Sequence, residues 1–240
     1  MKVWRVPDMW KNSDVWIIGG GPSIIPTFQI PESVVESVRQ RKAGLDTYSQ
    51  YFAPLHSKHV IGINVAYQLG SWVDMCFLGD LNFFDVHRAG LSHFTKLVVT
   101  CHEKVGKKEL SWVKYLPHEK RVVKDPQESE YGISTRPDRV CWNHNSGAAA
   151  ISVAAWTGAK RIILVGFDMT LDAVTKEQHF HNEYRKKGTI RQPIQLPFSK
   201  HLRPWGIIKR DADNMGIEIL NTSLNSAIKE IKKVHIKELL

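Results

Sequence analysis

The chain has 240 residues, enough for one compact α/β domain with a sizeable core. Hydrophobic residues make up 42% of it and charged residues 24%, a composition that excludes a disordered or fibrous protein. The net charge of +9 indicates attraction to polyanions or anionic substrates, although charge alone does not establish a nucleic-acid site.

The three cysteines lie far apart along the chain, at Cys76, Cys101 and Cys141. An odd, scattered set argues against a disulfide framework and predicts buried thiols in a reducing compartment. The N-terminal residues lack the apolar core of a signal peptide, and no stretch reaches the roughly 18 apolar residues that span a bilayer. We therefore expect a cytoplasmic protein without a membrane span.

Short runs rich in Val, Ile and Leu, each bounded by turn residues, predict the strands of the fold. They cover residues 15–18, 59–63, 75–78, 97–100, 121–123, 161–165 and 218–220. Helical patterns at 31–40, 146–156 and 202–215 lie between or after these runs, and Pro204 is expected to interrupt or kink the last helix. This alternation indicates an α/β, Rossmann-like fold, with a mostly parallel sheet and helices on both faces.

Two segments break the alternation. Residues 102–139 are rich in Lys, Glu, His and Pro and are predicted to form an irregular excursion. Residues 169–201 are polar and follow a predicted strand directly, which is where an inserted active-site lid would lie. No other feature divides the chain, so residues 1–240 are expected to form a single domain.

A glycine-rich loop follows the first predicted strand. Gly19, Gly20 and Gly21 remove side chains where the backbone must turn, and Pro22 and Ser23 complete the loop. Bare backbone amides in such a loop can approach a phosphate closely. The pattern matches neither a P-loop nor the dinucleotide fingerprint, so a plain strand-to-loop turn is the alternative.

Polar residues also stand at three other element ends. Asn64 and Asp80 follow the strands at 59–63 and 75–78, while Asn145, Ser146 and Gly147 open an alanine-rich helix. Each residue is also a good turn or cap residue. The free amides of the helix's first turn are equally suited to a phosphate or carboxylate, and capping is compatible with such binding.

Histidine is the natural acid/base candidate near neutral pH. His179, His181 and His201 lie in or beside the predicted lid, and Asp168 ends the strand at 161–165. Asp168 is suited to bind a metal, to orient a histidine or to cap the following turn. The sequence does not choose among these roles.

These segments resemble those of bacterial family 42 sialyltransferases. Residues 19–23 are similar to their Gly-Asn-Gly-Pro-Ser loop, and residues 145–168 are similar to their segment from Thr-Ser-Gly to Gly-Ile-Asp. The tail at 217–226 also has a counterpart. The same elements occur in the related DUF115 proteins, which include archaeal-type 6-hydroxymethylpterin diphosphokinases. The resemblance covers roughly residues 13–80 and 140–240.

The resemblance implies nucleotide contacts and a catalytic histidine, for which His201 is the nearest match. The chain also departs from the sialyltransferase pattern. Gly20 replaces an asparagine, Asn143 replaces an arginine, and residues 169–171 replace the segment that carries tyrosines beside the leaving phosphate. The nucleotide pocket is therefore better matched than the sialyl-transfer chemistry.

We predict a nucleotide-dependent, glycosyltransferase-like enzyme that moves a group from a nucleotide or nucleotide-sugar donor to an acceptor hydroxyl. His201, then His181, with Asp168 nearby, are the catalytic candidates, and no metal is required. The predicted nucleotide-binding residues are Gly19, Gly20, Gly21, Pro22, Ser23, Asn64, Asp80, Asn145, Ser146 and Gly147. Replacing Gly21 by valine and Ser146 by alanine together is expected to abolish nucleotide binding and leave the fold largely intact.

Two alternatives stay open. The first is a diphosphokinase that transfers diphosphate from ATP to a pterin-like alcohol, with Asp80 and Asp168 as Mg²⁺ ligands. The second is a non-catalytic nucleic-acid-binding module that uses the basic residues between 185 and 210. For the enzyme, the same basic residues also allow an acceptor that is polyanionic.

Overall fold

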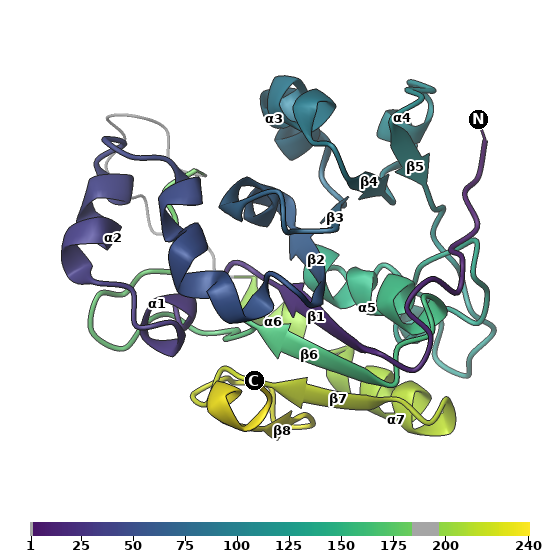
Figure 1. Cartoon of the computed structure of the whole chain (residues 1–240). Helices are drawn as coiled ribbons and strands as arrows, with labels where there is room; N and C mark the ends of the chain where they lie inside the picture. Colours follow the sequence, from purple (N-terminus) through teal and green to yellow (C-terminus); the bar gives the residue numbers. More distant parts are fainter. Residues whose placement is uncertain (1, 184–196) are drawn as a thin grey trace.

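The computed structural model describes residues 2–183 and 197–240. These residues form one eight-stranded sheet in the order β5-β4-β3-β2-β1-β6-β7-β8, with every neighbouring pair parallel (Figure 1). The strands are β1 (Asp14–Ile18), β2 (His59–Ile63), β3 (Met75–Leu78), β4 (Leu97–Thr100), β5 (Val113–Tyr115), β6 (Arg161–Val165), β7 (Glu218–Asn221) and β8 (Lys232–Lys233).

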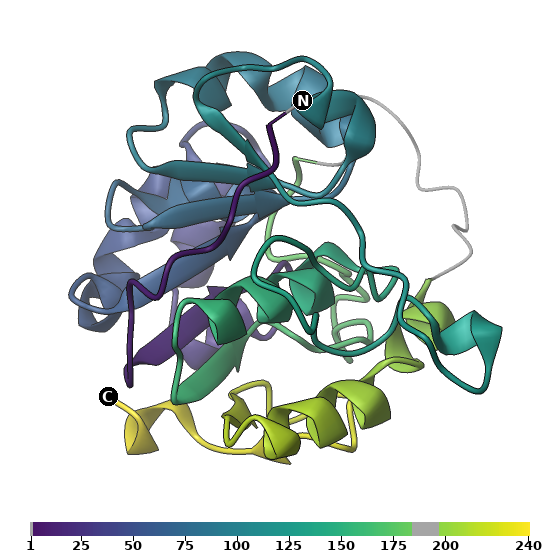
Figure 2. The same cartoon turned by 90° about the vertical axis from the view of Figure 1, so that its right-hand side faces the viewer.

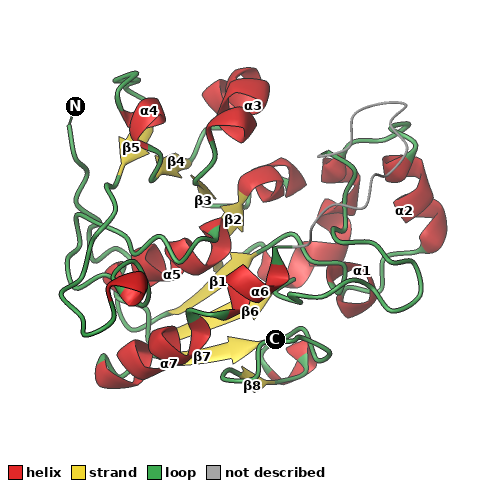
Figure 3. Ribbon diagram, turned by 180° about the vertical axis from the view of Figure 1, so that it is seen from behind, coloured by secondary structure: helices red, strands yellow, loops and turns green. Residues whose placement is uncertain are grey.

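The helices lie on both faces of this sheet (Figure 3). The α-helices are α1 (Ile24–Thr27), α2 (Glu32–Arg39), α3 (Leu81–His93), α4 (Glu103–Gly106), α5 (Ser146–Trp156), α6 (Phe198–Leu202) and α7 (Trp205–Asn214). The 3₁₀ helices are η1 (Leu45–Leu55), η2 (Asn64–Leu69), η3 (Pro126–Glu128) and η4 (Ile236–Glu238). The middle of the predicted lid, residues 184–196, lies outside the described residues.

The side chains of β1 alternate between two hydrophobic cores, because successive residues of a strand point to opposite faces. Val15 and Ile17 pack in the core that contains α5 and α7. Trp16 and Ile18 pack in the core that contains α2, η1 and α3. The prediction of a Rossmann-like α/β fold with helices on both faces is confirmed.

The order of the strands fixes where a ligand would bind. From β1 the chain adds β2 to β5 on one side, and it then returns to place β6 on the other side of β1. Open α/β sheets bind their ligands at such a switch point, outside the carboxyl ends of the strands. In this chain the switch point lies between residues 19–23, which follow β1, and residues 166–168, which follow β6.

Helix α5 packs closely on the sheet because its side chains are small (Figure 2). Every residue from 147 to 155 is buried, and the helix contacts β1, β2 and β3. Alanine favours helix and lets the helix backbone approach the strands. Although α5 is apolar, it has only 11 residues, and no helix in the described part of the chain is long and apolar enough to cross a membrane.

The predicted strand at 121–123 is wrong. Val122 is fully exposed, and Arg121 forms an ion pair with Asp211 of α7 instead of joining the sheet. The predicted helix at 202–215 is two helices, because α6 ends at Leu202 and Pro204 caps the start of α7.

The excursion at 102–139 is only partly irregular. It contains α4, η3 and the edge strand β5, which pairs with β4. Strands β5 and β8 were not predicted, because each is short and carries lysine. The three cysteines are buried free thiols, as expected, and burial raises the pKa of the Cys141 thiol to about 12.

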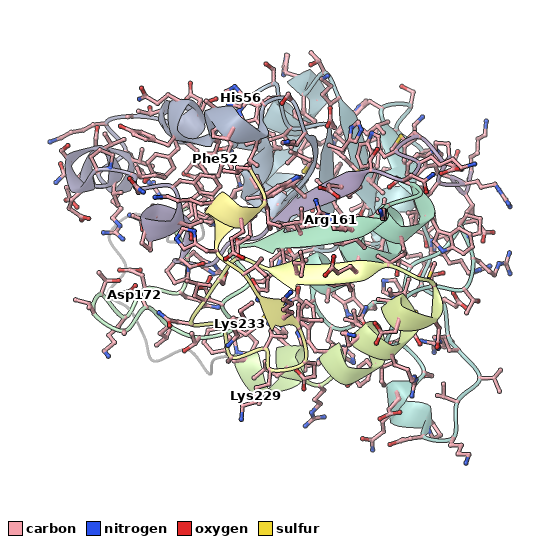
Figure 4. The ribbon with its side chains drawn as sticks, turned by 60° about the horizontal axis from the view of Figure 1, so that its bottom comes forward. Phe52, His56, Arg161, Asp172, Lys229 and Lys233 are labelled. Carbon is pink, nitrogen blue, oxygen red and sulfur yellow. The ribbon has the colours of Figure 1, made fainter. Side chains whose placement is uncertain are left out.

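The two edges of the sheet are protected in different ways. Val3 of the N-terminal segment bridges to Tyr115 of β5. At the other edge, Lys233 of β8 donates a hydrogen bond from Nζ to the Ser226 carbonyl at 2.5 Å, and Lys229 lies on the preceding segment (Figure 4). Lysines on an edge strand disfavour pairing with a second chain.

Candidate functional site

A cavity of about 280 Å³ lies at the switch point. Eight of the ten predicted nucleotide-binding residues line it: Gly19, Gly20, Gly21, Asn64, Asp80, Asn145, Ser146 and Gly147. The other two, Pro22 and Ser23, line a neighbouring cavity of about 460 Å³. The glycine loop and the N-terminus of α5 therefore face one shared space.

The glycine loop is held tightly against the residues that follow β6. The Gly19 amide donates to Val165 O at 2.8 Å, and the Gly21 amide donates to Gly166 O at 2.9 Å. Of the three glycine amides, only that of Gly20 has no backbone acceptor among the described residues. The loop thus offers one free amide to a ligand.

Close packing, rather than ligand approach, explains Gly21. A Cβ atom at this position would overlap Asp168 Oδ2 and would lie 2.6 Å from Gly166 O. The expectation that Gly21→Val leaves the fold intact is therefore wrong. A substitution that tests the nucleotide site must be made elsewhere.

A chain of hydrogen bonds joins the loops after β1, β6 and β7. The Phe167 amide donates to Ser223 Oγ at 3.1 Å, and Ser23 Oγ donates to Asp168 Oδ2 at 2.9 Å. The two serine hydroxyls are 2.8 Å apart. Because the Ser23 proton is directed to Asp168, the Ser223 hydroxyl must donate to Ser23. Asp168 therefore fixes the end of the glycine loop.

Burial raises the pKa of Asp168 to about 6, although hydrogen bonds from Ser23 favour the charged form. The residue is 5% exposed and lines both cavities. The contact with Ser23 shows that Asp168 positions the glycine loop. Its predicted catalytic role stays a prediction.

The Asp168 pKa predicts a pH-dependent stability. The ordinary pKa is 3.8 and the folded value is about 6, so the native state binds this proton more tightly than the unfolded chain does. Stability should therefore fall as the pH rises from about 4 to about 6. A difference of about two pKa units corresponds to about 3 kcal/mol.

Urea denaturation of the wild type and of Asp168→Asn at pH 4, 5, 6 and 7 checks this result. The wild type should lose about 2 kcal/mol relative to the variant between pH 4 and pH 7, because pH 4 already lies just above the unfolded pKa. Asp172 lies in the loop that follows β6 (Figure 4), and hydrogen bonds from Thr175 lower its pKa. A lowered pKa changes stability only below about pH 4, so the difference between wild type and Asp172→Asn should stay nearly constant from pH 4 to pH 7. A constant difference between wild type and Asp168→Asn would contradict the raised pKa.

The N-terminus of α5 provides a second set of amides. Asn145 caps the helix, since its Oδ1 accepts from the Ala148 amide at 3.0 Å. The Ser146 and Gly147 amides have no intrahelical acceptor and donate to no described residue, yet both residues line the cavity. Two free amides at the positive end of an 11-residue helix can hold an anion.

The backbone before α5 is unusual. Asn143 and His144 both have positive φ angles, 54° and 51°. The Asn143 side chain holds this turn: its Oδ1 accepts from the Gly132 amide at 2.8 Å, and its Nδ2 donates to Gly132 O at 2.9 Å. The turn places His144 and Trp142 on the cavity wall.

Trp142 forms a flat part of this wall. One face of its ring stacks on His118, with ring centroids 5.3 Å apart and planes 9° from parallel. Gly79 leaves room for the ring, because a Cβ atom there would overlap it. Neither Trp142 nor His144 was predicted, although both lie within four residues of Ser146 in the sequence.

Three histidines line the cavity: His144, His179 and His201. His181, the second catalytic candidate, is not among them. It is 4% exposed, its ring stacks on His179, and burial lowers its pKa well below the usual value. His179 Nδ1 lies 3.3 Å from Gly20 O, so the cavity-facing histidine of this segment is His179.

His201 is held in place by α7. Trp205 donates from Nε1 to the His201 carbonyl at 3.0 Å, and its ring packs edge-to-face on Phe167. Burial, Lys200 and His144 lower the pKa of His201. A neutral imidazole at pH 7 is suited to accept a proton.

Asn64 and Asp80 lie on the wall that follows β2 and β3. Asn64 has a φ of 51°, and its Oδ1 is buried without a hydrogen-bond donor among the described residues. Asp80 Oδ1 accepts from the Phe83 amide at 2.7 Å and caps α3. Asn64 therefore offers an acceptor to a ligand, whereas Asp80 also has a structural role.

The residues proposed for Mg²⁺ do not form an assembled metal site. Asp80 Oδ1 caps α3, and Asp168 Oδ2 accepts from Ser23. Within the described ranges, no three His, Cys, Asp or Glu side chains converge on a position suited to a metal ion. The carboxylates that a diphosphokinase would use are thus engaged with protein donors.

Neither a protein-family model nor a curated protein sequence matches the chain. Among solved structures, it is similar to the MAf glycosyltransferase from Magnetospirillum magneticum AMB-1, with a TM-score of 0.59 and 12% identity. That match covers 99% of this chain but 36% of the glycosyltransferase, so this chain spans little more than a third of its length.

The sialyltransferase CstII from Campylobacter jejuni, solved in complex with the substrate analogue cytidine-5'-monophosphate, is also similar, with a TM-score of 0.51 and 14% identity. That match covers 94% of this chain and 86% of CstII. A point variant of Cst-II in complex with CMP gives a TM-score of 0.51 and 13% identity, covering 93% and 86%. The chain therefore has the α/β fold that is found in these glycosyltransferases.

Proposed function

We propose that this protein transfers a glycosyl group from a nucleotide-sugar donor to an acceptor hydroxyl. The observation that carries the proposal is the switch-point cavity, where the free amides of Ser146 and Gly147 share one space with Gly20 and His201. This space combines an anion-binding helix end with a neutral base. In a metal-independent glycosyl transfer, such amides can stabilise the leaving phosphate and such a base can take the proton of the acceptor hydroxyl.

The donor phosphate would lie at the N-terminus of α5. Its charge would be met by the Ser146 and Gly147 amides and by the positive end of the helix. The buried Asn64 Oδ1 would accept a hydrogen bond from a hydroxyl or amino group of the nucleoside. Trp142 would provide a flat surface for the base. The solved sialyltransferase complexes contain CMP, which makes cytidine nucleotides the first donors to test.

His201 would act as the base. Its imidazole would take the proton of the acceptor hydroxyl as that oxygen attacks the anomeric carbon and the bond to the leaving phosphate breaks. No metal ion is needed for this step, because helix amides neutralise the phosphate. Lys200 and Arg203 are exposed beside the cavity and form no ion pair with a described residue, which favours an anionic acceptor.

Replacing Ser146 by proline should weaken nucleotide binding by roughly 10- to 100-fold, because it removes one amide donor to a charged group. Proline is well tolerated at the first position of a helix, and Asn145 already has the extended conformation that precedes proline. The helix should therefore stay intact. Ser146→Ala, which keeps the amide and removes only the hydroxyl, is the matched control and should have a smaller effect.

Calorimetric titration with CMP, CDP, UDP, ADP and ATP, each with and without Mg²⁺, measures these affinities. The proposal expects metal-independent binding that is impaired in Ser146→Pro. Binding of ATP only with Mg²⁺ would support the diphosphokinase alternative. Salt-dependent binding of nucleic acid with no affinity for any nucleotide would support the binding-module alternative.

A further inference from the structure

His144 occupies a strained position that points to a role in the cavity. It and Asn143 are consecutive non-glycine residues in the left-handed region, with φ of 51° and 54°. Such a conformation is uncommon and costs on the order of 1 kcal/mol or more for each residue. It persists only where the surrounding structure holds it.

A series of contacts from α7 holds this turn. Asp211 Oδ2 accepts from the Ile133 amide at 3.0 Å and pairs with Arg121. The neighbouring Gly132 exchanges two hydrogen bonds with the buried Asn143 side chain. The position of the His144 backbone is thus fixed through Asn143.

The His144 ring lies among several charged and titratable groups. Tyr131 packs edge-to-face on it, with ring centroids 5.7 Å apart. Burial lowers the His144 pKa, Lys200 and Arg203 lower it further, and Glu130 raises it. The charge of His144 lowers the pKa of His118 and of His201, so both histidines lie near enough to interact with it.

The other cavity-lining groups that hold exchangeable protons already have defined contacts. His179 Nδ1 lies 3.3 Å from Gly20 O, and its ring stacks on His181. Asp168 accepts from Ser23. His201 is the base of the proposed reaction. His144 is left as the titratable side chain nearest in sequence to the Ser146 and Gly147 amides on the cavity wall.

We propose that His144 donates a proton to the leaving phosphate oxygen of the donor. This inference rests on the proposed glycosyl transfer. The acceptor oxygen forms the new bond to the anomeric carbon and gives its proton to His201. The electron pair of the broken bond passes to the phosphate oxygen, which takes the His144 proton. Proton exchange with water then restores both histidines.

A phosphate bound beside His144 would stabilise the imidazolium, because an opposite charge within a few ångströms favours the charged form. The free protein holds His144 largely neutral at pH 7, so nucleotide binding should be accompanied by proton uptake. This uptake can be measured without any turnover.

The test is calorimetric titration of CMP at pH 7 in buffers of different ionisation enthalpy. The wild type should take up a substantial fraction of a proton on binding. His144→Asn should abolish most of this uptake, and asparagine tolerates the left-handed backbone. His93→Asn, which replaces an exposed histidine that lines neither cavity, is the control and should leave the uptake unchanged.

Turnover of a CMP-linked sugar donor should also fall by roughly 100-fold or more in His144→Asn, as for loss of a general acid. If the variant does not fold, the pKa of the His144 ring can be measured in the wild type by NMR titration. The proposal expects CMP to raise this pKa. Proton uptake that survives in His144→Asn, or a His144 pKa that CMP does not raise, would overturn the role of His144 and leave the proposed function standing. Absence of nucleotide binding by the wild type would overturn both.

Discussion

Replacing Asp211 by alanine should lower the free energy of unfolding by about 3 kcal/mol, the order expected when one partner of a largely buried ion pair is removed. Asp211 is 8% exposed and receives hydrogen bonds from two directions. Arg121 Nη2 donates to its Oδ1 at 3.3 Å, and the Ile133 amide donates to its Oδ2 at 3.0 Å. The variant would leave the Arg121 charge and the Ile133 amide without these acceptors.

Asp213→Ala is the matched control for this experiment. Asp213 lies on the same helix, but it is exposed, and among the described residues its ion-pair partner is Lys209, four residues earlier. Such surface pairs contribute about 0.5 kcal/mol or less. Urea denaturation followed by circular dichroism should therefore separate the two variants clearly. Equal effects would mean that the Arg121–Asp211 pair does not anchor the excursion to α7.

The Asp211 variant should also impair the cavity. The contacts of Asp211 lead through Ile133 and Gly132 to Asn143, which fixes the turn that precedes α5. We expect the affinity for nucleotide to fall in Asp211→Ala and to stay unchanged in Asp213→Ala. The excursion thus has a defined structural role, although its composition resembles that of a loop.

Replacing His201 by alanine should lower turnover by roughly 100- to 10,000-fold and change donor affinity only a few-fold. The reason is that a general base acts in the transition state, whereas the donor is held by the amides of α5. Because burial lowers the pKa of His201, the wild-type rate should rise with pH through a pKa below 6.5 and fall again at higher pH, where the proposed acid His144 loses its proton. This rise should be lost in the variant.

Steady-state kinetics and calorimetry on the same preparations measure the two quantities. His93→Ala provides a control, because His93 is exposed at the end of α3. A comparable loss of binding and of turnover would assign His201 to donor binding. An unchanged rate would remove it from the mechanism.

The central strands could be predicted because burial on both faces gives them a recognisable sequence pattern. Strands β1 to β4 and β6 are buried on both faces, and such strands are continuous apolar runs. The edge strands β5 and β8 are short and partly exposed, so no comparable run identifies them. The apolar pair Val122–Val123 led to a wrong strand prediction. In the structure Arg121 pairs with Asp211 of α7, and Val122 faces solvent.

The site could be predicted where it depends on the order of elements, but not where it depends on side-chain contacts. Glycines after β1 and small residues before α5 must meet in a parallel sheet. His179 lines the cavity, whereas Phe180 and His181 are buried. The sequence alone does not show which of the two histidines reaches the cavity. The proposed role of His144 depends on the left-handed turn at 143–144, which no sequence pattern predicts.

The alanines of α5 limit where substitutions could alter the substrate selectivity of this protein. With side chains this short, the helix has almost no freedom to slide or tilt, and any larger residue would push it away from the strands. The part of the cavity wall formed by α5 should therefore tolerate little change. Altered selectivity should be sought at Thr170 and Gln178, which lie on loops and line the cavity, by saturation mutagenesis that leaves the helix untouched.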